Sequence, residues 1–311
     1  MSEFTLGFVL ALLCAISWAV LDVSRKQMGR KMTATGAAAG LMCLHIVLIN
    51  PLLLTGSLTE GDGALYETVL VGYPELSVAY FWPTAVSVVL NLAANFLFFR
   101  AVQLSPLGLT IPYLAFTPVF TALTALIFLG QVPTSSGWMG IAVVCLGAFF
   151  INPGQSADGA LAPLKALWTE RGSFYMLIVA LLWSVTPILD KTAAELTSPM
   201  WHTMFLAGTV GVVFVAYRGV VDSSLRPLWK EFRAIPLWLI MGGFFATAAM
   251  VLQLTSYVYI DVAYVETIKR AIGVTAAIVV GFVIFGERDL RRRLLGALIM
   301  SLGVALILLA G

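Results

Sequence analysis

The chain alternates long apolar segments with shorter polar ones along its length. Each apolar segment has about 20 residues, which is what a helix needs to cross the hydrocarbon core of a bilayer. The sizeable polar stretches are 55–78, 153–172 and 218–234. This pattern predicts an all-α polytopic membrane protein with ten transmembrane helices and no room for a soluble catalytic domain. The predicted helices are residues 4–23, 35–54, 80–104, 107–129, 135–152, 173–192, 199–217, 235–257, 263–285 and 294–310.

Composition supports a membrane protein and narrows its partners. Of the 311 residues, 60% are hydrophobic and only 11% are charged, whereas soluble domains carry about 25% charged residues. The formal net charge is +2 and most basic residues lie in loops between apolar segments, so no nucleic-acid partner is expected. The cysteines fall within apolar segments without disulfide or metal spacing, and the two histidines are isolated along the chain. We expect no metal and no cofactor.

Lysine and arginine residues are concentrated in alternate loops, beginning with the first. An excess of these residues marks cytoplasmic loops. The opposite side has only Lys191 and the acidic loop 55–78. With ten crossings, both termini are therefore expected outside the cytoplasm, in a plasma membrane such as a bacterial inner membrane. The first segment lacks the basic leader of a cleavable signal peptide, so we interpret it as an uncleaved anchor.

The two halves of the chain resemble each other. Residues 129–151 align without gaps on 285–307, and Trp18 of the first half aligns with Trp183 of the second. Each half contains five predicted helices, an odd number, so the second copy enters the membrane upside down relative to the first. Inverted repeats are typical of secondary transporters, in which the substrate site lies near the midplane.

The repeat defines the expected domains, which are a first copy at 1–152, a connecting loop at 153–172 and a second copy at 173–311. Duplication has a simpler interpretation as well, since it can merely build a stable bundle. Small residues let helix backbones approach closely, which is the role we favour for the matched glycines. These pairs are Gly140 with Gly296 and Gly147 with Gly303.

The segment SPLGLTIPYLAFTPVFTALTALIFLGQ, followed by a glycine-rich helix, and its second-half counterpart ending IVVGFVIFGE resemble the EamA-type drug/metabolite transporter superfamily. The resemblance covers the whole length and implies two five-helix EamA repeats. It also implies a central cavity lined mainly by the first, third, fourth, sixth, eighth and ninth helices. Two features depart from the family pattern. Gln131 stands where a glutamate is common, although Glu287 is kept in the second copy, and the predicted external termini are opposite to the usual orientation.

Three charged residues, Glu266, Lys269 and Arg270, lie inside the apolar segment 263–285. Spacings of three and four residues place them on one helix face. A charge at membrane depth costs about 3 kcal/mol even on the lenient insertion scale, so such residues normally face a cavity or a partner. The planar donor fork of arginine and the point charge of lysine together suit a phosphate or carboxylate.

The Lys269–Arg270 pair is similar to the pair by which triose-phosphate translocators, distant relatives, hold the phosphate of their substrates. Glu266 precedes Arg270 by four residues and is expected to neutralise it between transport events. The alternative is a buried ion pair that fixes this helix against its neighbours, with Lys269 extending toward the interface.

Tyr113 aligns with Lys269 in the gapless register of the repeat, so it is expected to face the cavity from the other half. Pro112 and Pro118 bracket it, and each removes a backbone hydrogen bond and can bend the helix. Proline is also common in transmembrane helices without a gating role.

Four further side chains are candidates for substrate binding. Asn91 and Asn95 form an i,i+4 pair that can hydrogen-bond a substrate, although amides also hold transmembrane helices together. Trp18 and Trp183 occupy equivalent positions in the two copies and can form aromatic walls of the pathway. Tryptophans at membrane boundaries are the alternative.

Two residues are candidate proton carriers within the membrane, Glu266 and His45. A lone histidine is more often a hydrogen-bonded structural residue. Asp190 with Lys191 closes the sixth predicted helix, where we expect a solvated or local ion pair.

The leading hypothesis is a secondary transporter that moves a small organic solute, anionic or zwitterionic, by alternating access. No nucleotide-binding loop of the G-x-x-x-x-G-K-[ST] kind is present, and no enzymatic activity is expected. A flippase for a lipid or lipid-linked head group is the alternative within transport. An integral membrane lipid-modifying enzyme is less favoured because intramembrane acids are few. A structural subunit is also less favoured, because a protein that carries nothing has no need of costly charges within the membrane. The expected partners are the small-molecule substrate and membrane lipids, the latter touched by the basic run 288–293.

Overall fold

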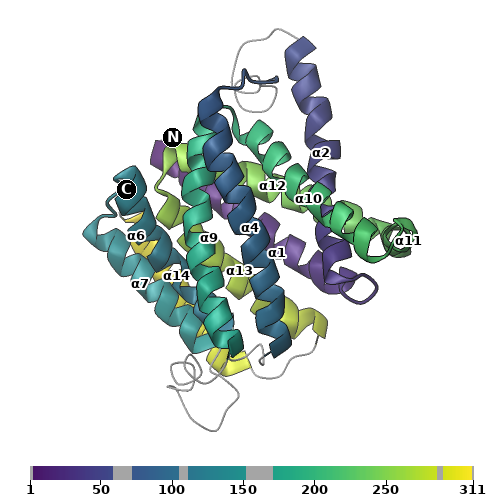
Figure 1. Cartoon of the computed structure of the whole chain (residues 1–311). Helices are drawn as coiled ribbons and strands as arrows, with labels where there is room; N and C mark the ends of the chain where they lie inside the picture. The colour runs from purple at the N-terminus through teal and green to yellow at the C-terminus, as the bar shows by residue number, and fades with distance from the viewer. Residues whose placement is uncertain (1–2, 59–71, 105–110, 152–170, 286–289, 310–311) are drawn as a thin grey trace. The chain divides into compact units, whose positions relative to one another are not determined.

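The computed structural model describes residues 3–58, 72–104, 111–151, 171–285 and 290–309. Every regular element in these ranges is helical (Figure 1). The predicted connecting loop lies almost entirely outside the described residues, as does Glu287. The elements are α1 (Glu3–Met28), α2 (Ala34–Leu58), α4 (Val78–Leu104), the 3₁₀ helix η1 (Ile111–Phe116), α6 (Thr117–Leu129), α7 (Ser135–Ile151), α9 (Arg171–Glu195), α10 (Pro199–Val221), α11 (Arg226–Ala234), α12 (Pro236–Tyr259), α13 (Val262–Phe285) and α14 (Leu290–Leu308).

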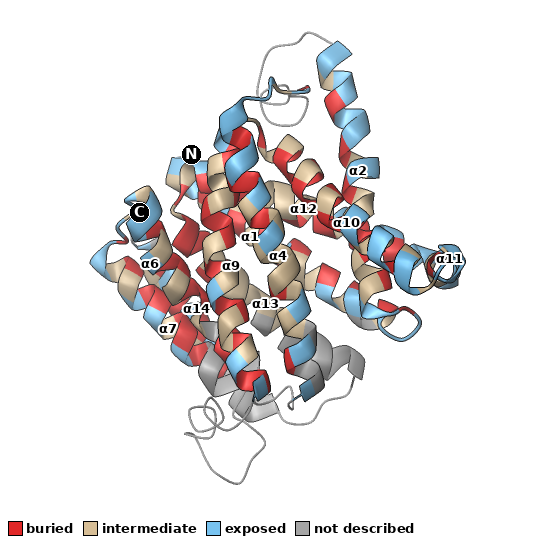
Figure 2. Ribbon diagram, in the orientation of Figure 1, coloured by how far each residue is buried: buried red, intermediate tan, exposed pale blue. Residues whose placement is uncertain are grey.

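Each of the ten apolar segments coincides with helical structure, with two differences from the prediction. The segment 107–129 is not one α-helix, because η1 precedes α6 and Pro118 stands in the first turn of α6. Proline is tolerated there because the first N–H groups of a helix have no intrahelical partner. The polar stretch 218–234 contains a further helix, the short and amphipathic α11, most of which is exposed (Figure 2).

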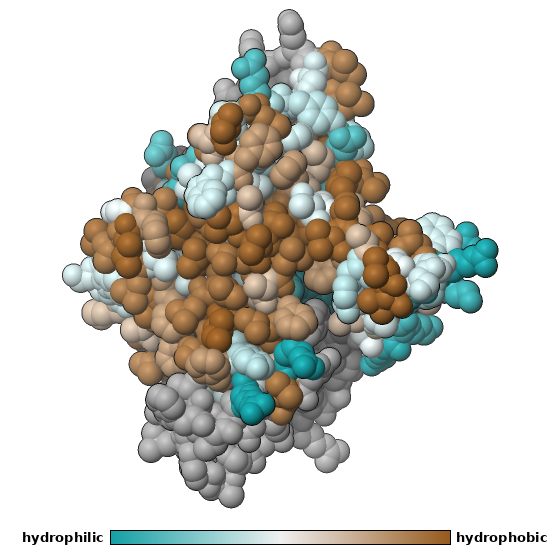
Figure 3. Space-filling view, in the orientation of Figure 1, coloured by the Kyte–Doolittle hydropathy of each residue, from teal (hydrophilic) through white to brown (hydrophobic). Residues whose placement is uncertain are grey.

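The helices have the length and surface of membrane-embedded segments. Within the described residues, six helices are long and apolar enough to cross a bilayer, namely α1, α2, α4, α9, α10 and α12. Large apolar side chains are exposed on their outer faces and on α6, where Ile127 is 73% exposed. Apolar residues cover much of the face in view in Figure 3. Such surfaces mark contact with lipid or another protein, and here they support a multi-pass membrane protein, whereas the exact number of crossings stays a prediction.

The chain forms two compact units, and each takes residues from both predicted repeats. Unit 1 comprises 1–15, 89–189 and 256–311, and unit 2 comprises 16–88 and 190–255. The boundaries between them fall within α1, α4, α9 and α12. Compact units and sequence repeats are therefore different divisions of this chain, and the predicted repeat boundaries stay a prediction.

In unit 1, α7 packs against α14 through the matched glycines. A Cβ atom added to Gly140 would lie 2.6 Å from the carbonyl oxygen of Gly303, and one added to Gly147 would lie 2.8 Å from that of Gly296. The two helices therefore run antiparallel, and their backbones approach each other closely at these glycines. Each glycine meets the repeat equivalent of the other, which is the exchange of roles found across a two-fold interface.

In unit 2, α2 packs against α10 in the same manner. A Cβ atom added to Gly208 would lie 2.7 Å from the Ile46 side chain, and one added to Gly211 would lie 2.9 Å from the Cys43 backbone nitrogen. At the spacing that separates Trp18 from Trp183, Cys43 corresponds to Gly208 and Ile46 to Gly211. Equivalent helices thus run antiparallel in both units, as an inverted repeat requires.

A buried arginine ties together three helix ends in unit 2. The Arg218 side chain is 8% exposed and pairs with Asp222 at 2.7 Å and with Glu231 of α11 at 3.0 Å. Its guanidinium also donates to the hydroxyl groups of Thr33 and Thr35, just before and within the start of α2. Glu231 in turn accepts hydrogen bonds from the backbone and hydroxyl of Thr33. This network fixes α11 against the ends of α2 and α10.

We predict that Arg218→Gln destabilises the protein by about 3 kcal/mol, because it leaves two carboxylates without their partner. Thermal unfolding of the detergent-solubilised protein measures the change. Arg226→Gln, at an exposed position of α11, is the matched control and should unfold as the wild type does. Equal unfolding temperatures for the two variants would contradict the role of the network.

Candidate functional site

The candidate site is built on the first turns of α13, in unit 1. The Lys269 ammonium lies 2.6 Å from Oε1 of Glu266, one helical turn earlier. The Lys269 side chain is 16% exposed and that of Glu266 is 10% exposed. Neither charge therefore points outward toward lipid, and each has its counter-charge on the same helix face, as the spacing predicted.

A third residue completes this pair from the preceding helix. The Tyr257 hydroxyl donates to the same Oε1 of Glu266 at 2.6 Å, and Tyr257 is 1% exposed. It reaches Glu266 because α12 ends at Tyr259 and α13 begins at Val262. The carbonyl of Asp261 accepts from the backbone N–H groups that open α13. The short turn thus places one face of α12 against the first turn of α13.

Arg270 follows Lys269 and is partly exposed. It lies close enough to Cys145 of α7 to interact with it electrostatically, and α13 packs on both α6 and α7. The Glu266 carboxylate contacts Lys269 and Tyr257, whereas its expected pairing with Arg270 stays a prediction. The acid and the two bases lie within the first turns of the same helix.

The start of α13 is also fixed to the segment before α7. The Tyr264 hydroxyl accepts a hydrogen bond from the backbone N–H of Thr134 at 3.1 Å, and the Gln131 side chain accepts one from the backbone N–H of Val262 at 3.3 Å. Gln131, the residue that departs from the family pattern, thus serves to hold the first turn of α13 in place.

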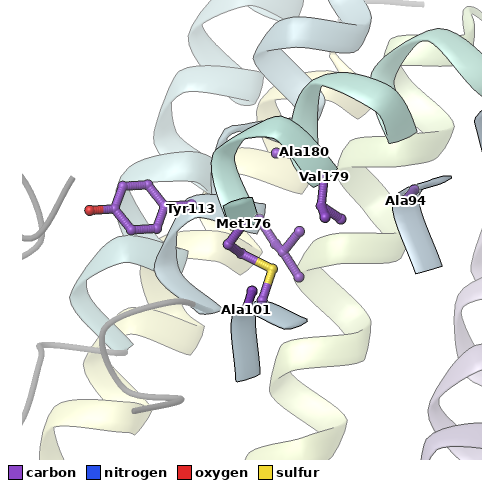
Figure 4. Close-up of a cluster of buried hydrophobic side chains, with 7 residues drawn as sticks. Ala94, Ala101, Tyr113, Met176, Val179 and Ala180 are labelled. Carbon is purple, nitrogen blue, oxygen red and sulfur yellow. The ribbon is translucent and has the colours of Figure 1, made fainter. Parts of the chain in front are cut away.

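Tyr113 is 3% exposed and lies in η1, in the same unit as Lys269. It belongs to a buried apolar cluster with Met176 and Val179 of α9, and its hydroxyl points away from these side chains (Figure 4). Ser173 of α9 hydrogen-bonds with that hydroxyl. The repeat equivalent of Lys269 is therefore a buried residue that contacts α9.

Asn91 and Asn95 are half-buried on α4. The Asn95 side-chain amide donates to the backbone carbonyl of Asn91 at 2.7 Å. At least this amide is engaged by its own helix, which favours the structural interpretation for Asn95.

The two equivalent tryptophans lie in different units and have different surroundings. Trp183 of α9 packs on Phe98, with ring centroids 5.8 Å apart. Trp18 of α1 donates its indole N–H to the Gln253 side chain at 3.3 Å, and the Arg25 guanidinium lies 5.3 Å from the centre of its ring. Both are held by protein contacts within their own units.

His45 is 1% exposed in α2 of unit 2. Its Nδ1 lies 3.0 Å from the carbonyl oxygen of Leu41, to which it donates, while Nε2 has no hydrogen-bond partner. Within the described residues its ring hydrogen-bonds to no acid, so the geometry gives it no counter-charge for an added proton.

The structure brings together a second polar cluster that the sequence did not predict. The sequence indicated a pair of Asp190 with Lys191, and an isolated ring at His202. Asp190 and His202 are instead both buried, and Asp190 Oδ1 lies only 3.3 Å from His202 Nε2. The interpretation of Asp190 as solvated is wrong, because α10 packs over the end of α9 after a short turn. The sequence does contain a signal for this cluster, because Asp190 lies near the end of the apolar segment 173–192 and His202 near the start of the next one, 199–217.

The sequence profile of the EamA-like transporter family matches residues 5–152 and 170–309. The chain therefore belongs to the EamA-like transporter family, a family of membrane transporters rather than enzymes. Among solved structures, one described as "Crystal structure of protein" matches with a TM-score of 0.70 and 14% sequence identity. The match covers 98% of this chain and 99% of the other chain. At that identity the likeness concerns the fold alone. No curated protein matches the chain.

We predict that Glu266→Gln destabilises the protein by about 3 kcal/mol, because it leaves the Lys269 ammonium without its counter-charge in an apolar segment. The double variant Glu266→Gln, Lys269→Met should recover most of this loss, since it removes both charges together. Thermal unfolding of the single and double variants measures the coupling. Additive effects in the double variant would show that the two side chains do not act as a pair.

Proposed function

We propose that this EamA-family protein is a secondary transporter for a small organic solute that carries a negative charge, either an anionic or a zwitterionic metabolite. The observation that supports the proposal is the cluster of Glu266, Lys269 and Arg270 on α13. Buried charges in apolar helices are costly and are kept where they serve a pathway or a site. The family supplies the transporter class, and this cluster supplies the chemistry.

The pairing of Lys269 suggests how a solute enters this site. Without solute, the ammonium is neutralised by Glu266 at 2.6 Å. A phosphate or carboxylate then replaces the glutamate at Lys269, and Arg270 adds two parallel N–H donors to the same anionic group. Glu266 keeps its hydrogen bond from Tyr257 and is left free to accept the ammonium group of a zwitterion. With a zwitterion, Glu266 and Lys269 each have an opposite charge as partner before and after binding, which lowers the desolvation cost of the exchange.

The transport cycle and its setting belong to the same proposal. The solute would bind near the membrane midplane, and the ten helices of an inverted repeat would expose the site alternately to the two sides. We propose a plasma membrane as the setting, and the distribution of lysine and arginine supports an orientation with both termini outside the cytoplasm.

We predict that anionic compounds stabilise the purified protein and that Lys269→Ala and Arg270→Ala each weaken this binding by about tenfold or more, the value of one charged hydrogen bond. Thermal shifts with inorganic phosphate, small carboxylates, amino acids, organic cations and lipids measure the effect. Arg270→Lys keeps the charge but loses the fork, so it should impair phosphate binding less than Arg270→Ala does.

Lys230→Ala, at an exposed position of α11, is the control and should bind as the wild type does. Unchanged affinity in folded Lys269→Ala and Arg270→Ala variants would remove the binding role of these side chains. Stabilisation by lipids alone would favour a flippase of the same family instead.

A further inference from the structure

The proposed solute site does not use the second polar cluster, which lies in unit 2. It consists of Asp190 of α9, His202 of α10, and Tyr80 and Ser87 of α4. All four are buried, with exposed fractions of 5% for Asp190 and 0% for the others. A carboxyl group and an imidazole at such depth in apolar helices carry a cost that a purely apolar contact between helices would avoid.

The four side chains form one continuous hydrogen-bonded chain. The Ser87 hydroxyl donates to Oδ1 of Asp190 at 2.5 Å, and the Nε2 atom of His202 lies 3.3 Å from the same oxygen. On the other side of the ring, the Tyr80 hydroxyl lies 3.3 Å from Nδ1 of His202. The rings of Tyr80 and His202 pack edge to face with centroids 5.8 Å apart, which holds this geometry.

Other charged groups on the surrounding helices have partners or lie apart. On α9, Lys191 pairs with Glu195 at 3.7 Å, and on α10, Arg218 belongs to the network with α11. The part of α12 in unit 2, residues 236–255, has no ionisable side chain. Further titratable or charged residues on segments of unit 2 include Asp22 and Arg25, paired with each other, Lys26, Arg30 and Lys31 at and after the end of α1, Cys43 and His45 on α2, the exposed Tyr73 and Glu75 before α4, and Tyr217 on α10. In the described part of the chain, His202 forms an ion pair with Asp190 when it is protonated.

We infer that Asp190 and His202 together form a proton-binding site. In the form without the extra proton, the Nε2–H of a neutral His202 donates to the Asp190 carboxylate, and Nδ1 accepts from the Tyr80 hydroxyl, so the cluster carries one negative charge. A proton delivered from water binds at Nδ1, which gives an imidazolium beside the carboxylate and no net charge. Histidine is the side chain that exchanges protons most readily near neutral pH.

Proton binding changes a contact between two helices. Once Nδ1 carries a proton, it donates to the Tyr80 oxygen, and the tyrosine O–H must turn to a different acceptor. The direction of the hydrogen bond between Tyr80 of α4 and His202 of α10 is thereby reversed. A ligand shifts a conformational equilibrium only through different affinities for the two states, and this reversal supplies such a difference. Resting on the proposed transport function, we assign to this site the coupling of solute movement to a proton gradient.

His45 provides a matched comparison within the same unit. It is equally buried, but it donates to a backbone carbonyl and contacts no carboxylate in the described residues. A proton on its second nitrogen would add a buried positive charge without a counter-charge. The inference therefore distinguishes two histidines that the sequence alone presents as similar.

Proton binding can be tested without any solute, because the chain has only two histidines. We expect ¹⁵N spectra of histidine-labelled protein in lipid nanodiscs to show that His202 gains a proton at Nδ1 as the pH is lowered. His202→Gln identifies its signals, and Asp190→Asn should move or abolish the transition, while His45→Gln should leave it in place. A His202 signal that does not change with pH, or that changes identically in Asp190→Asn, would overturn the inference.

Coupling is tested in proteoliposomes with labelled inorganic phosphate, followed by the carboxylates of the thermal-shift panel. We expect Asp190→Asn and His202→Gln to lower pH-gradient-driven accumulation by about tenfold. Solute counterflow, which needs no pH gradient, should proceed at the wild-type rate. His45→Gln should accumulate solute normally. Full accumulation in folded Asp190 and His202 variants would remove the coupling role.

Tyr80→Phe tests the helix link by deleting a single oxygen atom. It should leave proton binding by His202 in place but lower gradient-driven accumulation, and normal accumulation in this variant would contradict the proposed reversal. If the wild type shows no counterflow with any compound, the proposed transport function fails. The nuclear magnetic resonance titration still decides proton binding in that case.

Discussion

The pairing of charges inside apolar helices is the constraint on which this structure depends. An unpaired charge in such surroundings is expensive, so each one needs a partner within reach. Lys269 has Glu266, Asp190 has His202, and Arg218 has Asp222 and Glu231. Each of these contacts joins a helix to itself or to a neighbour at a defined register. The paired charges therefore also position the helices that carry them.

The scaffold is close to symmetric, but its chemistry is not. The glycine contacts of α7 with α14 and of α2 with α10 repeat with exchanged roles, as expected for two copies of one ancestral unit. At the positions equivalent to Lys269 and His202, however, the first copy has Tyr113 and Ala37. Symmetric backbone packing thus provides two similar halves, while the charged groups of both clusters come from the second copy. Function in such a scaffold depends on a few side chains grafted on shared packing.

Both clusters consist of donors and acceptors that can exchange partners. The Glu266 carboxylate accepts from both Lys269 and Tyr257, and His202 lies within hydrogen-bond distance of both Tyr80 and Asp190. In the proposed cycle an anion replaces Glu266 at Lys269, and an added proton reverses the bond between His202 and Tyr80. Such exchange keeps buried charges paired in each state, so the states differ little in free energy. A transporter needs this property because a deep minimum in one state would stop the cycle.

Hydropathy and helical periodicity are local properties, so the sequence by itself determined the apolar helices, the common face of Glu266 and Lys269, and the glycines at close contacts. It did not determine the 3₁₀ break at η1 or the short helix α11. The charged residues of α11 made its segment resemble a polar loop, although their spacing is amphipathic. The links from Tyr257 to Glu266 and from Asp190 to His202 cross between helices. Such contacts depend on how a turn orients two helices, and only the tertiary structure decides that.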